Sequence, residues 1–468
     1  MASYAPGSFR DPDSAVFTTT AGSVRRGLSE RAADDYDRLC ATRFFPRLIE
    51  AGDIVGTTDS DGREDAGAPL SPRGEPWARV LEHERIPVVS YPYEWPFAML
   101  RAAASLELEV LRAALDDGMS LKDGTAYNVQ FVGSRPVFID IGSFEPASGP
   151  WPGYRQFCQT LLFPLLVHAH LGVPPQPLLR GSVDGLAPTD VAGMFRGLRR
   201  FRKGVLRNVT LHGLLDRRVK TATEETKADL KRAGFSTEVT KATAANLAKL
   251  VAGLDVGRRA STWKDYRTTC SYSADDAEAK QAFVRAAIAD GPSDLVLDLG
   301  ANDGEYARLA ADHAGYVVAV DSDESVIDGL YRRLRADGDE RILPLVMNLA
   351  DPSGGIGWRN RERAAFVDRV RPDVVLALAL VHHLTIAANV PLPEVVSWLG
   401  AYGGRVVVEF VHRDDVQVRR LLANKPPGLF DDYRRESFEA LLGEQFLVHE
   451  QTTLPAGTRT LYLAEPKR

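Results

Sequence analysis

The chain has little of what marks a secreted or membrane-embedded protein. Its 468 residues contain only three cysteines, Cys40, Cys158 and Cys270, so neither a disulfide framework nor a zinc site is expected. No apolar run reaches the ~18 residues that a membrane span requires, and the run at 161–171 predicts a buried helix. The first residues lack a basic start followed by an apolar segment, so we expect no secretory signal and a cytoplasmic location.

An excess of charge of one sign is also lacking. The chain carries 57 Lys and Arg against 63 Asp and Glu, which argues against a surface committed to nucleic acid. The charge is nevertheless uneven, because residues 196–267 hold 18 Lys and Arg but seven Asp and Glu. This basic stretch, with helical patterns at 223–233 and 240–253, is either a solvated face or a site for an anionic substrate. We expect a small-molecule substrate, with neither nucleic acid nor a membrane as partner, and make no prediction of oligomeric state.

The C-terminal part of the chain has a regular rhythm of apolar runs separated by helix-like spacers. The runs lie at 294–300, 316–321, 341–347, 373–380 and 404–410. Val, Ile and Leu dominate with little polar alternation, which is typical of strands covered on both faces. Strands that alternate with helices predict a doubly wound α/β domain beginning near residue 261. Residues 446–454 and 459–466 predict an antiparallel pair at the edge of the sheet.

A loop with two glycines follows the first of these strands. It runs from Asp298 to Gly304 as DLGANDG, and a helical pattern follows it. Gly300 and Gly304 would let the backbone turn sharply and approach a ligand closely. The next strand ends at Asp321, where an acid can accept hydrogen bonds from both hydroxyls of a ribose. Asn302 replaces the middle glycine of a dinucleotide loop, and the surrounding acids suit an ammonium or a sulfonium better than a pyrophosphate.

The order of these parts resembles that of class I S-adenosylmethionine-dependent methyltransferases over about residues 273–468. The resemblance implies a Rossmann-like fold and S-adenosyl-L-methionine as cofactor. It places the loop 298–304 on the methionine portion and Asp321 on the ribose, with Asn348 or Asp351 near the adenine. The implied activity is a biosynthetic methyl transfer to an oxygen or nitrogen of a small, specialised metabolite or saccharide.

Three side chains are candidates for the catalytic step, and no metal is expected among them. His382 and His383 follow the fourth strand, where the substrate should lie, and a histidine can accept a proton near neutral pH. His382 is the better base if the next helix begins at Leu384, whereas in related enzymes a histidine at the position of His383 often orients a loop. Glu409 closes the fifth strand and either orients a donor group or caps the turn there.

Aromatic residues precede the first helix of the same domain. Trp263, Tyr266 and Tyr272 stand where they would either cover the cofactor or pack in an interdomain hinge. Both interpretations remain open from the residues alone.

The N-terminal part has its own local patterns. Residues 87–95 predict a strand followed by a rigid extended turn, because prolines punctuate the segment. Residues 97–115 follow with a long helical pattern rich in Ala and Leu. A further strand, at 136–140, leads into an Asp-Ile-Gly sequence.

One constellation in residues 1–260 resembles the catalytic half of protein-kinase-like phosphotransferases, over about residues 87–145. Asp123 is followed five residues later by Asn128, then by a hairpin and by Asp140-x-Gly. The resemblance implies that Asp123 is the base and that Asn128 and Asp140 hold metal ions. Because a G-x-G-x-x-G loop and a plain strand lysine are missing, we expect a degenerate kinase-like α+β domain that binds or docks the substrate. Phosphotransfer, alone or in a bifunctional kinase–methyltransferase, is the alternative.

Segments spread over the whole chain are similar to a little-characterised group of bacterial methyltransferases, some of them labelled nodulation host-specificity proteins. The segments are YPYEW, LKDGTAYNVQF, FIDIGSFE, GYRQF and HHL. We therefore expect a substrate-binding domain at 1–260 and a methyltransferase domain at 261–468. A non-enzymatic protein that senses S-adenosylmethionine is a further alternative.

Overall fold

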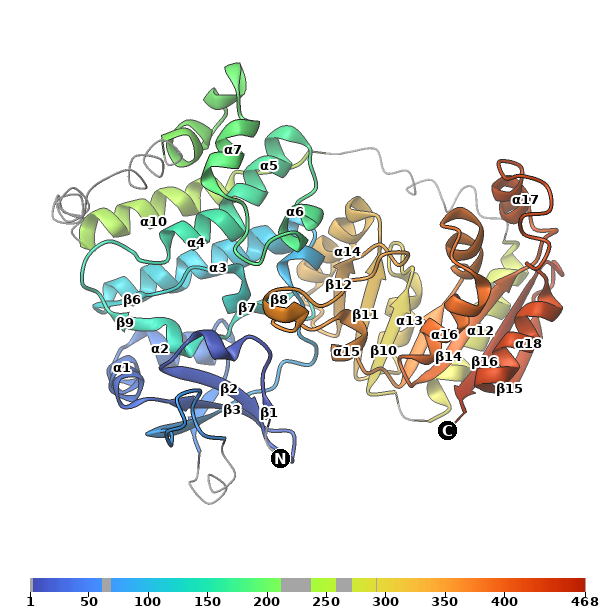
Figure 1. Cartoon of the computed structure of the whole chain (residues 1–468), viewed down its shortest axis with the longest axis horizontal. Coiled ribbons are helices and arrows are strands. Elements are labelled where there is room, and N and C mark those ends of the chain that lie inside the picture. Colours follow the sequence, from blue (N-terminus) through green and yellow to red (C-terminus); the bar gives the residue numbers. More distant parts are fainter. Residues whose placement is uncertain (1–2, 61–68, 212–236, 258–271, 292, 468) are drawn as a thin grey trace. The chain divides into compact units, whose positions relative to one another are not determined.

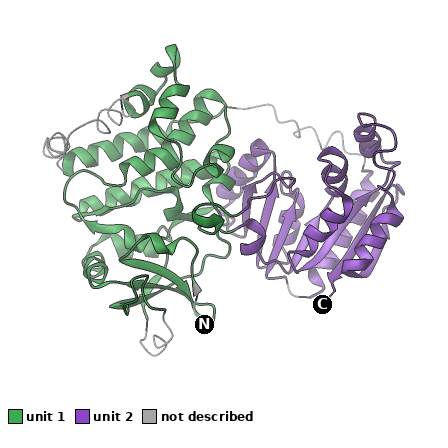
Figure 2. Cartoon of the chain, in the orientation of Figure 1, with its two compact units in different colours: residues 1–258, 355–364 green, residues 259–354, 365–468 purple. Residues whose placement is uncertain are grey.

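The structure of the chain is a computed structural model that describes residues 3–60, 69–211, 237–257, 272–291 and 293–467. The chain divides into two compact units (Figure 1, Figure 2). The first unit comprises residues 1–258 and 355–364, and the second comprises residues 259–354 and 365–468. The ten residues 355–364 thus belong to the first unit although their neighbours in sequence belong to the second.

The second unit is built on a seven-stranded sheet with the order β12-β11-β10-β13-β14-β16-β15. Its strands are β10 (Leu295–Leu299), β11 (Tyr316–Asp321), β12 (Ile342–Val346), β13 (Val374–Ala377), β14 (Arg405–Val411), β15 (Phe446–Thr453) and β16 (Arg459–Pro466). The first five strands in this order are parallel, and β16 runs antiparallel to both β14 and β15. The doubly wound sheet and its antiparallel edge pair are confirmed.

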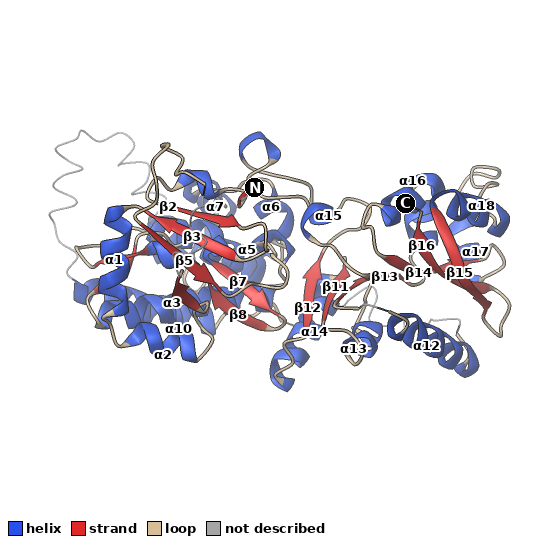
Figure 3. Cartoon of the chain, turned by 90° about the horizontal axis from the view of Figure 1, so that it is seen from below, coloured by secondary structure: helices blue, strands red, loops and turns tan. Residues whose placement is uncertain are grey.

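Helices cover both faces of this sheet (Figure 3). They are α12 (Ala274–Ala289), α13 (Glu305–Ala311), α14 (Glu324–Asp337), α15 (Phe366–Arg369), α16 (Leu392–Gly400), α17 (Val416–Leu422) and α18 (Arg435–Gln445). The helices α12, α13 and α14 share one buried apolar cluster with β10 and β11, including Phe283 and Leu330. Because both faces are covered, strands β11, β12 and β13 are buried along almost their whole length.

The first unit begins with an antiparallel sheet of order β1-β2-β3-β5-β4. Its strands are β1 (Ser3–Tyr4), β2 (Ser14–Thr18), β3 (Val24–Leu28), β4 (Thr57–Asp59) and β5 (Arg79–His83), with α1 (Glu30–Cys40) and α2 (Phe44–Glu50) inserted between β3 and β4. The long helix α3 (Phe97–Asp116) follows, as the sequence predicts. The named strands of this unit pair antiparallel and the long helices lie outside them, so this unit is α+β.

Two short strand pairs come after α3. They are β6 (Met119–Leu121) with β9 (Phe144–Pro146), and β7 (Val129–Val132) with β8 (Arg135–Phe138). The described residues from 154 to 257 are mainly helical and include α4 (Tyr154–Phe157), α5 (Phe163–Leu171), α6 (Gln176–Arg180), α7 (Pro188–Met194) and α10 (Thr237–Ala252). The buried helix expected at 161–171 and the helix expected at 240–253 are confirmed, whereas the pattern at 223–233 lies outside the described residues. None of the described helices has the length and apolar content needed to cross a membrane.

The strand predicted within 87–95 is wrong. The segment contains the 3₁₀ turn η3 (Pro92–Glu94) and pairs with no strand. The backbone N–H of Ser90 donates to Oε1 of Gln130, and that of Tyr91 donates to Oε2 of Glu94, each at 2.9 Å. Buried side chains therefore satisfy the backbone donors that a neighbouring strand would otherwise take.

The segment 355–364 is a small hairpin held within the first unit. Its ends pair through a bridge between Ile356 and Arg363. The carboxylate of Glu362 is buried and accepts a hydrogen bond of 2.8 Å from Nη2 of Arg10. The backbone N–H of Ala364 donates to the hydroxyl of Tyr91 at 3.1 Å. These contacts explain why the segment leaves the unit to which its neighbours belong.

Candidate functional site

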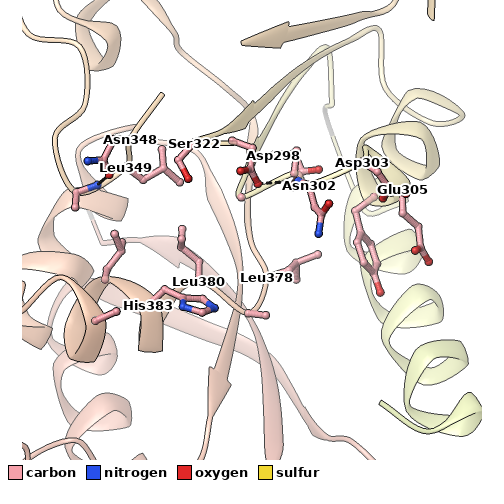
Figure 4. Close-up of a pocket in the computed structure, with 18 of the residues that line it drawn as sticks. Asp298, Asn302, Asp303, Glu305, Ser322, Asn348, Leu349, Leu378, Leu380 and His383 are labelled. Carbon is pink, nitrogen blue, oxygen red and sulfur yellow. Dashed lines mark hydrogen bonds between the residues drawn. The ribbon is translucent and has the colours of Figure 1, made fainter. Parts of the chain in front are cut away.

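A cavity of about 470 Å³ opens in the second unit where the parallel strands end (Figure 4). Its wall combines the loop after β10, the ends of β11 and β12, the turn after β13 and one side of α12. The polar and charged residues on the wall are Tyr272, Lys280, Asp298, Asn302, Asp303, Glu305, Tyr306, Asp321, Ser322, Asn348 and His383. Ligands of open α/β sheets bind at this edge, so the topology and the cavity indicate the same place.

The glycine loop adopts the tight turn that its sequence predicts. Gly300 and Gly304 both have φ of +84°, and Asn302 has φ of +49°. A Cβ at Gly304 would lie 2.7 Å from the side chain of Leu330, whereas one at Gly300 would have nothing nearer than 3.8 Å. The backbone N–H of Gly300 donates to the carbonyl of Val320 at 2.8 Å. The loop is thus held against β11, and Gly304 also permits the close approach of α14.

Asp321 lies at the end of β11 and lines the cavity, as expected. Its Oδ2 accepts a hydrogen bond of 2.9 Å from the backbone N–H of Asn302, and its Oδ1 accepts one of 2.9 Å from that of Asp323. Burial raises the pKa of this carboxyl above its ordinary value. A carboxylate offers about four lone-pair sites, so Asp321 can also accept a hydrogen bond from a ligand hydroxyl.

Asp298 is the most deeply buried acid of the cavity wall. It is 1% exposed, and its Oδ2 has no hydrogen-bond partner among the described residues. Burial, followed by the nearby charge of Asp321, raises the pKa of Asp298 to about 7, against the opposing charge of Lys280. A buried oxygen without a partner is costly, and a ligand cation or donor in the cavity would satisfy it.

A buried network of charges stands behind one wall of the cavity. Nζ of Lys280 lies 2.7 Å from Oε2 of Glu409 and donates to the hydroxyl of Tyr272 at 2.7 Å. The same ammonium lies 4.6 Å from the ring centre of Tyr272 and 4.8 Å from that of Tyr306. Nη1 of Arg459 lies 3.2 Å from Oε1 of Glu409. Burial acts to raise the pKa of Glu409, but the charges of Lys280 and Arg459 outweigh it and hold the pKa below its ordinary value.

The two histidines take different places. His383 lines the cavity, and burial, followed by the charge of Arg459, lowers its pKa to about 4. His382 is fully buried behind it, with ring centres 4.1 Å apart, and neither of its ring nitrogens has a hydrogen bond among the described residues. Helical structure begins at Val381, three residues before Leu384, and continues as η10 (His383–Ala387). The condition that favoured His382 as the base is therefore not met.

Of the remaining predicted site residues, some lie on the cavity wall and others do not. Asn348 lines the cavity, whereas Asp351 is not on its wall. Glu409 is not on the wall, but it contacts two residues that are, Lys280 and Tyr272. Tyr272 lines the wall, while Trp263 and Tyr266 lie outside the described residues.

Sequence reasoning missed Lys280 and Tyr306. Lys280 stands in a helix rich in Ala, Asp and Glu, where a lysine normally extends into solvent, yet it is only 3% exposed. Tyr306 is two residues beyond the glycine loop and carried no separate signal. The one signal in the sequence that could have indicated Lys280 is its position on the inner face of the helix before the first strand of the second unit.

The kinase-like constellation of the first unit differs from its expected form. Oδ1 of Asp140 forms an ion pair of 2.9 Å with Nη1 of Arg26, which comes from β3. Burial and the charge of Asp140 raise the pKa of Asp123. Asn128 is buried, and its Nδ2 has no partner within the described ranges. No three His, Cys, Asp or Glu side chains in the described part of the chain are grouped so as to hold a metal ion.

No protein-family model matches the chain. The nodulation protein NoeA of Rhizobium meliloti strain 1021 is 34% identical over 467 residues, which cover 98% of this chain and 95% of NoeA.

Two solved structures show weaker similarity. The N-methyltransferase NodS of Bradyrhizobium japonicum WM9, in complex with S-adenosyl-L-homocysteine, is 12% identical, with a TM-score of 0.32 over 44% of this chain and 93% of NodS. The magnesium protoporphyrin IX methyltransferase of Synechocystis PCC 6803 is 14% identical, with a TM-score of 0.31 over 44% of this chain and 94% of that one. The fold assignment rests on the strand order rather than on these values.

Proposed function

The chain belongs to the family of the nodulation protein NoeA, and we propose that its second unit transfers a methyl group from S-adenosyl-L-methionine to an oxygen or nitrogen of a small metabolite or saccharide. The observation that carries this proposal is the pair of acids, buried Asp298 and partly buried Asp321, on either side of a glycine loop at the ends of neighbouring parallel strands. An acid-lined cavity of this kind suits a cationic nucleoside better than a pyrophosphate.

The residues of the cavity fit the groups of that cofactor. Oδ2 of Asp298, which has no partner among the described residues, would accept from the ammonium of the methionine portion. The lone pairs left on Asp321 would accept from the ribose hydroxyls, and Asn348 would lie at the adenine. Lys280 would face the carboxylate of the methionine portion, because its ammonium is the cationic side chain among the described residues of the wall. The bound cofactor supplies an electrophilic methyl group on a sulfonium.

The role of the chain in the chemical step is to position the methyl acceptor. Methyl transfer is an in-line displacement, so alignment of the two reacting atoms supplies much of the rate enhancement. His383 is neutral at pH 7 because its pKa lies near 4, and a neutral ring nitrogen can accept the proton of a substrate hydroxyl or amine. In this proposal His382 supports the ring of His383, and Glu409 acts through Lys280.

The first unit, which contains most of residues 1–260, is proposed to bind or dock the substrate. Phosphotransfer there is the alternative, and the electrostatic interaction between Asp123 and Asp140 favours it. The ion pair between Asp140 and Arg26 weighs against it, because the guanidinium takes the place that a metal ion would need. If phosphotransfer occurs, ATP with Mg²⁺ will raise the melting temperature, and Asp140→Ala will remove that shift.

A cytoplasmic location is part of the proposal. Cys40 and Cys158 are free thiols, and free thiols persist in a reducing compartment.

A protein that only senses S-adenosylmethionine would bind the cofactor but yield no methylated product from any fraction of the cell's metabolites.

Calorimetric titration of the full chain with S-adenosyl-L-homocysteine tests the cofactor site. We expect saturable binding that Asp321→Ala weakens by about 1–3 kcal/mol, which is roughly 5- to 150-fold. Asp351→Ala is the matched control, because this acid follows the neighbouring strand but is not on the cavity wall. Absence of binding to the folded wild type would reject the proposal, and equal losses in the two variants would reject the ribose assignment.

A further inference from the structure

One short surface segment of the first unit, residues 194–207, carries six cations and no acid. It follows α7 in the green part of the ribbon in Figure 1 and includes the turn η7 (Gly197–Phe201). Its cations are Arg196, Arg199, Arg200, Arg202, Lys203 and Arg207. All six are exposed, and none forms an ion pair within the part of the chain that the structure describes. A concentration of unpaired positive charge of this size attracts an anionic partner.

Large apolar side chains project from the same segment. Leu198 exposes 87% of its surface and Phe201 exposes 59%, and Met194 and Leu206 are also exposed. The guanidinium of Arg200 lies 4.7 Å from the ring centre of Phe201. Leucine and phenylalanine side chains this exposed are unfavourable in water, and several close together in sequence indicate a surface that a partner covers.

The segment is anchored at both ends, so its centre projects from a fixed base. Phe195 is 2% exposed and Val205 is fully buried. The ring of Phe195 packs edge-on against His170 of α5, and the carbonyl of Lys203 lies 3.0 Å from Nε2 of the same histidine. The chain between these anchors presents Leu198 and Phe201 outward, between arginines on both sides.

We propose that the segment 194–207 binds the surface of an anionic lipid bilayer. Its six cations would lie at the headgroup phosphates, and Leu198 and Phe201 would insert into the boundary between headgroups and acyl chains. This is peripheral binding and needs no spanning helix. It revises the expectation that no membrane is a partner, which rested only on the missing span.

Two other classes of partner fit the segment less well. A stable protein interface takes about 20–30 residues on each side, and this projecting segment offers fewer. An RNA backbone would neutralise the cations, but it would leave Leu198 exposed, because phosphates offer no apolar surface. Insertion into lipid uses both the charge and the apolar side chains, and it requires no groove of matching shape.

Co-sedimentation of the full chain with vesicles tests the proposal. We expect binding to phosphatidylcholine vesicles that contain about one third phosphatidylglycerol, weak binding to pure phosphatidylcholine, and loss of binding at high salt. One basic residue near such a surface contributes about a five-fold change in partitioning. The double variant Arg199→Glu with Arg200→Glu should therefore bind at least about 25-fold more weakly. Leu198→Ser with Phe201→Ser, which leaves the charge unchanged, should lose about ten-fold or more.

The matched control is Arg335→Glu with Arg420→Glu, which makes the same charge change at exposed arginines of the second unit. It should retain binding, and all variants should keep the wild-type melting temperature. If the control loses as much vesicle binding as the Arg199 and Arg200 variant, the effect depends only on net charge and the proposal is overturned. Full release from the vesicles by millimolar inorganic phosphate would overturn the proposal in favour of a simple anion site. Full release by an RNA oligonucleotide that binds the Leu198 and Phe201 variant as well as the wild type would overturn it in favour of a nucleic-acid site.

Discussion

Lys280 and Glu409 form an ion pair of 2.7 Å in which the side chains are 4% and 0% exposed. The pair connects α12, which precedes the sheet, to β14, the fifth of its parallel strands in chain order. Lys280 also lies on the cavity wall. One buried contact therefore joins the packing of the second unit to its proposed cofactor site.

We expect Lys280→Met to lower the free energy of unfolding by about 3–5 kcal/mol, because it leaves the carboxylate of Glu409 buried with one cation fewer. The double variant Lys280→Met with Glu409→Leu should recover most of this loss, since no unpaired charge remains. Denaturant unfolding measures both. Arg308→Met, which removes an exposed pair with Asp337, is the control and should cost less than about 1 kcal/mol. A double variant no more stable than the single one would contradict this account.

The affinity for S-adenosyl-L-homocysteine should rise with pH between about 6 and 8. The ligand's ammonium favours the ionised form of Asp298, whose pKa is near 7 in the ligand-free protein. Below that pKa, binding must release a proton, so the association constant should approach a ten-fold change per pH unit. Calorimetry in buffers of different ionisation enthalpy measures the proton directly. Asp298→Asn should abolish the dependence, and a dependence that survives in this variant would point to another group.

The same carboxyl should destabilise the ligand-free protein at high pH. Its pKa is raised on folding, so its contribution favours the folded state most at low pH and is lost as pH rises towards 7. We therefore expect Asp298→Asn to raise the free energy of unfolding by roughly 2–4 kcal/mol at pH 8 and by less at pH 5. Unfolding curves at the two pH values decide this. An equal effect at both would show that the ionisation of Asp298 is not the cause.

The two loop glycines should respond differently to alanine. Gly304→Ala meets both a left-handed backbone and a Cβ contact of 2.7 Å, so it should cost about 2–4 kcal/mol of stability. Gly300→Ala meets only the backbone strain and should cost about 1–2 kcal/mol, but it should also weaken ligand binding. Gly338→Ala is the control, because Gly338 has φ of +66° and open space around it. This variant should show a similar loss of stability but an unchanged affinity for the ligand. Thermal unfolding and calorimetry separate the three outcomes.

The sheet of the second unit could be predicted closely because its signal is local. Strands buried on both faces are continuous apolar runs, and the limits of β10, β11, β12 and β14 agree with the predicted runs within about one residue. The glycine loop and Asp321 follow from that register, since they stand at fixed places after two consecutive strands. Their positions on the cavity wall needed no long-range information.

The charge network could not be predicted, because its members lie far apart in sequence. Tyr272 and Arg459 meet across 187 residues, with Nη1 of Arg459 donating to the hydroxyl at 2.6 Å. Glu362 and Arg10 are 352 residues apart. No periodicity or spacing indicates such pairs. The strand predicted within 87–95 was wrong for a related reason, because the side chain of Gln130, and not a partner strand, accepts the backbone hydrogen bond there.

The hairpin at 355–364 has a consequence for how this polypeptide can be divided. The chain passes from one unit to the other at residue 258, returns at 354 and leaves again at 364. A single cut near residue 260 therefore yields no pair of self-sufficient fragments. The C-terminal piece would carry Glu362 without the arginine that neutralises it, and the N-terminal piece would lack the hairpin on Tyr91. The contacts of the hairpin with Arg10 and Tyr91 therefore favour expressing the two units as one chain.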